Sequence, residues 1–187
     1  MNKHLHLRRL SRAFTVTLAA AGLVASTMPA AQAAPARDRE GTTRVAVAPA
    51  VVKKLDRLGL EAAPTRYSTA VPFKGTVAFR FPVTAVERNG QVIKHRGGAR
   101  ISSSHDSIAL KRFTIKLRQG KVGAAVVVNG ERVGRTEVFN LRPSGRPALG
   151  DVRLTLTHAA ARAINSTFGA PAFEAADTFG FATVKLR

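Results

Sequence analysis

Apolar and polar residues alternate along much of the chain, and this period of two is typical of β-strands that are buried on one face. The longest run covers residues 73–83, where Phe, Gly and Val at the odd positions are separated mainly by polar residues. Shorter runs of the same kind cover residues 122–128, 131–141, 152–156 and 178–186. Many short alternating runs predict an antiparallel sheet.

Turn-forming dipeptides separate several of these runs. Asn89-Gly90 and Asn129-Gly130 each supply two residues that tolerate the positive φ of a two-residue hairpin turn, and Gln119-Gly120 predicts a further turn. Between the two Asn-Gly turns, the alternation changes parity at Lys111-Arg112, which predicts a β-bulge there. The strands are therefore expected to be joined as hairpins.

Two segments have helical spacing instead. The first has Pro49 near its start and Gly59 as its stop, and the second begins after a capping Thr157 and runs to about Thr167, before Gly169. Together with the alternating runs, these segments predict a mainly β domain. We expect an antiparallel β-sandwich or open barrel with two short helices.

The first 33 residues have the parts of an export signal. A basic, acid-free start is followed by an apolar run at 14–24 and by Ala31-Gln32-Ala33, a small-x-small cleavage site. The apolar run is shorter than the roughly 20 residues of a spanning helix, so we expect a cleaved signal peptide, with an uncleaved anchor as the alternative. Arg8-Arg9 lacks the flanks of a twin-arginine signal, which favours general secretion.

The rest of the chain is expected to fold as one unit. Residues 34–44 are small, charged and turn-prone, which predicts a disordered terminus, and residues 45–187 form a single β-rich domain. The chain has no cysteine, so an exported form is stabilised by packing alone. No later segment is apolar for long enough to cross a bilayer. We predict a secreted, extracellular protein without transmembrane insertion, associated with the cell wall.

The charge of the chain is strongly positive. Residues 34–187 carry 26 of the 30 Lys and Arg residues and all 11 acidic ones, a formal net charge of +15. Such a charge favours anionic partners, although biased composition alone is the alternative explanation. Nucleic acid is a poor candidate, because readers of single strands need stacking aromatic rings and the chain has no Trp and one Tyr.

Many of these cations belong to one predicted hairpin region, and pairing of its strands would bring them onto one surface. The alternative is that they only protect the sheet from edge pairing. The candidate binding residues of this basic surface are Lys94, Arg96, Arg100, Lys111, Arg112, Lys116, Arg118 and Lys121.

No catalytic or metal site is predicted. The segment 102–107, Ser-Ser-Ser-His-Asp-Ser, contains the residue types of a serine triad, but adjacent residues cannot converge as a triad requires. We expect a polar turn whose side chains bond the local backbone. His95, His105 and His158 lack the spacing of a metal-binding motif. The sequence therefore predicts a protein that is not an enzyme.

Several short motifs, in their order along the chain, resemble a known group of proteins. They are Val47-x-Pro49-x-Val51-Val52, Val77-x-Phe79-x-Phe81-Pro82-Val83, Ile93-x-His95-x-Gly97-Gly98 and Leu154-Thr155-Leu156-Thr157. In this order they resemble secreted actinobacterial proteins that are similar to the Htaa domain of haem-transport surface proteins. The resemblance implies a β-rich exported domain, and haem held by a tyrosine with help from a histidine. It nominates Tyr67 and His95 for these roles.

Two functions follow as hypotheses. The first is a secreted, non-enzymatic β-sandwich module of the cell envelope that binds anionic wall polymer through its basic residues. The alternative is an Htaa-type domain that binds haem or another hydrophobic small molecule, which requires a deep apolar pocket. An exported hydrolase is a third interpretation, and it rests only on the Ser/His/Asp segment.

Overall fold

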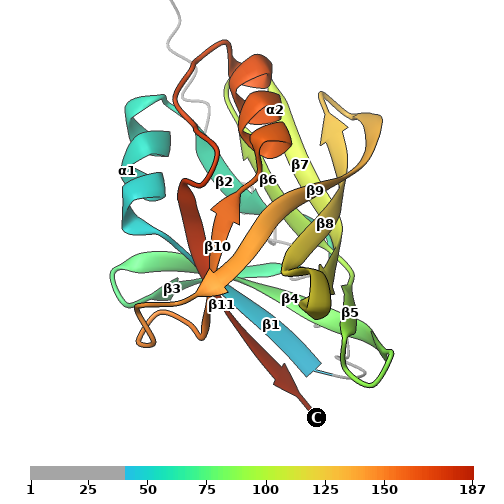
Figure 1. The fold of residues 1–187 in the computed structure, drawn as a ribbon. Coiled ribbons are helices and arrows are strands. Elements are labelled where there is room, and N and C mark those ends of the chain that lie inside the picture. The colour runs from blue at the N-terminus through green and yellow to red at the C-terminus, as the bar shows by residue number, and fades with distance from the viewer. Residues whose placement is uncertain (1–40) are drawn as a thin grey trace, which may run out of the picture. The chain divides into compact units, whose positions relative to one another are not determined.

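The structure is a computed structural model, and it describes residues 41–187 (Figure 1). Within these residues, the chain forms strands that belong to one antiparallel sheet, two α-helices and a short 3-10 helix. The strands are β1 (Gly41–Val47), β2 (Glu61–Pro64), β3 (Thr69–Phe73), β4 (Thr76–Glu87), β5 (Val92–His95), β6 (Gly98–Ser102), β7 (Ser107–Lys116), β8 (Lys121–Val128), β9 (Glu131–Pro143), β10 (Val152–Leu156) and β11 (Thr178–Leu186). The helices are α1 (Pro49–Arg57), α2 (His158–Phe168) and the 3-10 helix η1 (Leu117–Gln119).

Eight of the strands close into a barrel. Their order around it is β1-β4-β5-β7-β8-β9-β10-β11, and β11 pairs back with β1. Three strands lie outside this ring. β6 pairs with the first half of β7, on the edge whose second half pairs with β5, while β2 pairs with β6 and β3 pairs with β4. The predicted fold class, mainly β with two short helices, is confirmed. Pairing of β7 with β8 closes the ring, so the architecture is a barrel.

The two helices lie at the same end of the barrel. β1 and β10 run toward that end, and α1 and α2 follow them directly, whereas β11 begins there (Figure 1). The opposite end is formed by the β4–β5 turn, by η1 between β7 and β8, and by the last residues of β11. This asymmetry gives the barrel one end with helices and one end without.

Local sequence signals explain both helices. α1 starts with Pro49 and buries Val51 and Leu55, which lie four residues apart on one face. α2 is capped by Thr157, whose Oγ1 accepts a hydrogen bond from the backbone N–H of Ala160 at 3.2 Å. Both predicted helices are confirmed in type and position.

The two Asn-Gly turns lie between strands, as predicted. Asn129-Gly130 is a two-residue turn between β8 and β9, whereas Asn89-Gly90 lies within a four-residue connection, residues 88–91, between β4 and β5. The pairing of β7 with β8 shifts in register between Lys111 and Thr114, and Arg112 has a φ of +53°, which is the predicted bulge.

Two expectations differ from the structure. The composition of residues 34–44 predicts disorder; residues 34–40 lie outside the described residues, but residues 41–44 begin β1, which pairs with β4 on one edge and β11 on the other. The alternation over residues 73–83 predicts one strand, but Lys74-Gly75 forms a turn with φ of +47° and +73° between β3 and β4. The strands that pair with residues 41–44 are distant in sequence, so local composition does not indicate them. The turn between β3 and β4 has Lys74 where Asn or Asp is usual, so the sequence does not mark it as a turn.

A pair of glycines allows β5 and β6 to follow one another along the same edge of β7. Gly97 has a φ of +76°. A Cβ atom at Gly98 would collide with the Leu110 carbonyl oxygen and lie 2.8 Å from the Lys111 Cα. The backbone of β7 therefore occupies the space that any side chain at Gly98 needs.

Replacing Gly98 is expected to destabilise the barrel. Gly98→Ala should lower the free energy of unfolding by about 3 kcal/mol, because two backbones must move apart. Gly130→Ala is the matched control, since its φ is +86° but nothing lies within 4 Å of its Cβ position, and it should cost about 1 kcal/mol. Urea unfolding measures both values, and an equal loss in the two variants would contradict the steric explanation.

Candidate functional site: a cavity inside the barrel

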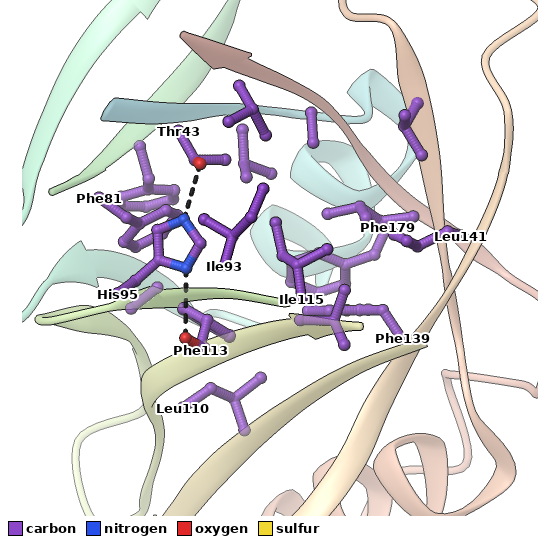
Figure 2. Close-up of a pocket in the computed structure, with 18 of the residues that line it drawn as sticks. Thr43, Phe81, Ile93, His95, Leu110, Phe113, Ile115, Phe139, Leu141 and Phe179 are labelled. Atoms are coloured by element: carbon purple, nitrogen blue, oxygen red, sulfur yellow. Dashed lines mark hydrogen bonds between the residues drawn. The ribbon is translucent and has the colours of Figure 1, made fainter. Parts of the chain in front are cut away.

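The interior of the barrel is not completely filled by side chains. It holds a cavity of about 370 Å³, to which every strand of the ring contributes lining residues (Figure 2). All of the lining residues are apolar or glycine except Thr43, His95 and Asp151. An eight-stranded barrel is just wide enough either to be packed by its own side chains or to hold one small ligand, and this one leaves space.

Aromatic side chains form opposite parts of the cavity wall. The rings of Phe81 and Phe113 meet edge to face with centroids 5.0 Å apart, and those of Phe139 and Phe179 lie 5.1 Å apart (Figure 2). Pairs of this kind hold each other in place. The wall is thus formed by side chains with defined positions, and its volume falls within the range of small-molecule sites.

The cavity extends toward the barrel end without helices. Leu117 of η1 and Leu186 of β11 both line it, and they are 44% and 49% exposed. They are two of the few large apolar side chains exposed on the described part of the chain. Ile164 of α2 lines the cavity from the other end and is buried. The apolar interior therefore continues to two exposed leucines at the end without helices, whereas the lining residue contributed by α2 is buried.

His95 and Thr43 form a buried polar pair in the apolar wall. His95 is 4% exposed and Thr43 is 3% exposed. The His95 Nδ1 lies 3.2 Å from the Phe113 carbonyl oxygen, and its Nε2 lies 2.7 Å from the Thr43 Oγ1 (Figure 2). A carbonyl oxygen only accepts hydrogen bonds, so Nδ1 carries the proton and donates it. Nε2 then holds the lone pair and accepts the hydroxyl hydrogen of Thr43.

Burial keeps this histidine neutral. Removal from water lowers the pKa of His95 to about 4, and the hydrogen bond to Phe113 opposes that change only in part. At neutral pH both ring nitrogens are therefore satisfied within the protein. Neither Thr43 nor this pairing was indicated by the sequence, because 52 residues separate the partners.

The two residues nominated for haem do not meet at this site. His95 lines the cavity, but Tyr67 lies in the turn between β2 and β3 and is 42% exposed. The Tyr67 ring is stacked against the guanidinium groups of Arg66 and Arg96, at 4.7 Å and 5.1 Å. Tyr67 is not among the residues that line the cavity, and the lone pair of His95 that a metal would need is already engaged by Thr43.

The strand pairing brings most of the candidate basic residues onto neighbouring strands. Lys94 of β5 lies opposite Thr114, and Lys116 of β7 lies opposite Lys121 of β8. Arg100 lies on β6 and Lys111 on β7, at positions that alternate with cavity-lining residues. The remaining three lie at the edges of this surface: Arg96 after β5, Arg112 in the bulge and Arg118 in η1.

Acidic groups neutralise part of this surface. Lys94 Nζ lies 2.6 Å from Glu87 Oε1, and Glu137 lies 3.7 Å from both Lys116 and Lys121. Arg135 of β9 also belongs to the surface, although the sequence pattern did not indicate it. It donates to the Arg112 carbonyl oxygen at 3.0 Å and to Thr114 Oγ1 at 2.8 Å.

The Ser/His/Asp segment forms a local turn, as expected from the sequence. Ser103 Oγ accepts hydrogen bonds from the backbone N–H groups of His105 and Asp106 at 3.2 and 3.0 Å. The Asp106 carboxylate accepts from Asn129 Nδ2 at 2.9 Å, not from the histidine. Across residues 41–187, no cluster of three His, Cys, Asp or Glu side chains has the arrangement to hold a metal ion. No helix within that range is long and apolar enough to cross a membrane.

No family model, curated protein or solved structure matches the chain. The resemblance to Htaa domains accordingly stays a prediction.

Proposed function

We propose that the barrel binds one small, predominantly apolar molecule in its interior. The observation that carries this proposal is the cavity of about 370 Å³, lined almost wholly by apolar side chains and continuous with the exposed Leu117 and Leu186. An apolar space of this kind leaves the atoms of its wall without contacts on one side. A ligand of matching size restores those contacts and removes its own apolar surface from water.

The barrel also limits what binding costs. The wall is made of strands whose backbone groups are paired around the closed ring, so little chain has to become ordered when a ligand enters. Of the two hypotheses drawn from the sequence, the structure therefore supports a small-molecule carrier better than a surface-binding module. Haem ligated jointly by Tyr67 and His95 has no such support, because Tyr67 lies outside the cavity.

A fluorescence titration tests this function. The neutral dye N-phenyl-1-naphthylamine gains emission in apolar surroundings, and we expect saturable binding of one dye per chain with a Kd in the micromolar range. Medium-chain alkanes and alcohols should displace it. A weak, linear rise in emission that no alkane reverses would contradict the proposal.

The basic outer surface supports a second candidate function. Lys94, Arg100, Lys111, Lys116 and Lys121 lie on adjacent strands, as a site for an anionic wall polymer requires. Such binding would suit a protein exported by the signal predicted at residues 1–33, which lie outside the described residues. Export and wall association are both part of this proposal.

Salt and charge reversal test the second candidate. Retention on isolated cell-wall material should fall several-fold between about 50 mM and about 500 mM salt, because salt screens exposed charges. Arg100→Glu with Lys111→Glu should reduce retention at low salt. Arg57→Glu with Arg162→Glu, exposed on the two helices, makes the same change in net charge and should have less effect. Equal losses in both double variants would argue against a defined surface.

A further inference from the structure

The polar pair in the cavity wall can still accept a hydrogen bond, but it has no hydrogen left to donate. The hydroxyl of Thr43 has one hydrogen, and it donates that hydrogen to His95 Nε2. His95 itself has nothing left to offer, because its Nδ1–H is donated to Phe113. What the pair still presents is a lone pair on Thr43 Oγ1, which makes no other hydrogen bond within the described chain.

This lone pair can accept a hydrogen bond but cannot donate one. We propose that the ligand of the barrel carries a hydroxyl group on an apolar body, and that this hydroxyl donates its hydrogen to Thr43 Oγ1. The inference rests on the proposed function and narrows it to a chemical class: aliphatic or aromatic alcohols of a size that fits the cavity. Ethers, esters and carboxylates of similar size offer only lone pairs and would face the Thr43 oxygen without a bond.

The pair is held in this polarity by the fold. For Thr43 to donate to a ligand, its hydrogen would have to leave His95 Nε2, which would then be a buried acceptor without a partner. The reverse tautomer of His95 would place a ring lone pair against the Phe113 carbonyl oxygen. Both changes are unfavourable in an apolar cavity, where hydrogen-bond partners are scarce and an unpaired polar atom is costly.

Asp151 does not provide a comparable hydrogen-bond acceptor for a ligand. It also lines the cavity, but it is exposed and lies in the segment just before β10, at the end without helices. Water reaches its carboxylate there, so a ligand gains little by bonding to it. Selection by hydrogen bonding is therefore expected at Thr43, within the buried wall.

A pair of isomers isolates the effect of the hydroxyl. Nonan-1-ol and methyl octyl ether have the same atoms and nearly the same apolar surface, but only the alcohol donates a hydrogen bond. In displacement of N-phenyl-1-naphthylamine, the wild-type protein should bind the alcohol roughly tenfold more tightly than the ether. Thr43→Ser keeps the hydroxyl and should keep the preference.

Removing the pair should remove the preference. Thr43→Val combined with His95→Phe removes the hydroxyl together with the ring nitrogen that Thr43→Val alone would leave without a partner. The alcohol would then bury its O–H without a partner, so its advantage should disappear and the ether should bind at least as tightly. Thr155→Val is the control, because Thr155 is a buried threonine that does not line the cavity, and this variant should keep the wild-type ratio.

The outcomes separate this inference from the function on which it rests. If the wild-type protein binds the ether as tightly as the alcohol, the Thr43 assignment is wrong and the apolar cavity site stands. If the double variant keeps the full preference for the alcohol, the hydroxyl of the alcohol forms its hydrogen bond with another residue, and the assignment to Thr43 is again wrong. If neither isomer displaces the dye and the dye itself does not saturate, the proposed function fails.

Discussion

Lowering the pH from about 6.5 to about 4 is expected to reduce the free energy of unfolding by about 3 kcal/mol through His95 alone. In the unfolded chain this histidine takes up a proton near the ordinary histidine pKa of 6.5, whereas burial holds its pKa at about 4 in the folded barrel. Between these values the unfolded state binds more protons, so stability rises with pH. The full contribution is present above about pH 6.5 and is lost as the pH falls.

Urea unfolding between about pH 7 and pH 5 measures this effect above the range in which carboxylates titrate. At Asp177, desolvation would raise the pKa, but hydrogen bonds from Lys54 and the Glu174 N–H lower it overall. Its contribution is lost only below that window. His105→Gln, at an exposed histidine, should keep the wild-type slope, and His95→Phe should flatten it. An unchanged slope in His95→Phe would contradict the assignment to His95.

Filling the cavity should abolish ligand binding without unfolding the barrel. Ala182 of β11 is 5% exposed and lines the cavity, so the larger side chain of Ala182→Leu would enter the space that a ligand needs. We expect the affinity for N-phenyl-1-naphthylamine to fall by about tenfold or more. The three added carbon atoms should raise the free energy of unfolding by about 2 kcal/mol, because each buried CH₂ group contributes about 0.8 kcal/mol.

Ala124→Leu provides the matched control for this variant. Ala124 has no exposed surface and does not line the cavity, so the same enlargement overpacks the core and should destabilise the protein by about 1–3 kcal/mol. Its folded fraction should still bind the dye. If Ala182→Leu binds as well as the wild type, the dye occupies another site.

Local features of the fold were predictable because short segments encode them. The two Asn-Gly turns, the Thr157 cap and the final strand at residues 178–186 all depend on neighbours within a few positions. The start of β1 was not predictable in this way, because Gly41–Arg44 are stabilised by pairing with β4 and with residues at the far end of the chain. Closure likewise depends on pairings that no local pattern specifies.

The cavity could not be predicted for a related reason. Alternation shows which face of each strand is apolar, but whether the inward side chains fill the interior depends on how the ring closes. His95 is nominated through a family resemblance, while its partner Thr43 lies in a stretch whose composition predicts disorder. The predicted hairpins bring basic residues onto neighbouring strands, and the register of β5, β7 and β8 places Lys94, Lys116 and Lys121 on such strands.

The most direct test of ligand binding inside the barrel is a titration with nonan-1-ol followed by methyl NMR. Ile93, Ile115 and Ile164 line the cavity, whereas Val133 is 68% exposed on β9 and is not part of it. We predict that the three isoleucine methyl signals shift and saturate at one alcohol per chain while the Val133 signals stay in place. Shifts that do not saturate, or that affect Val133 and leave the isoleucines unchanged, would contradict a binding site in the barrel interior.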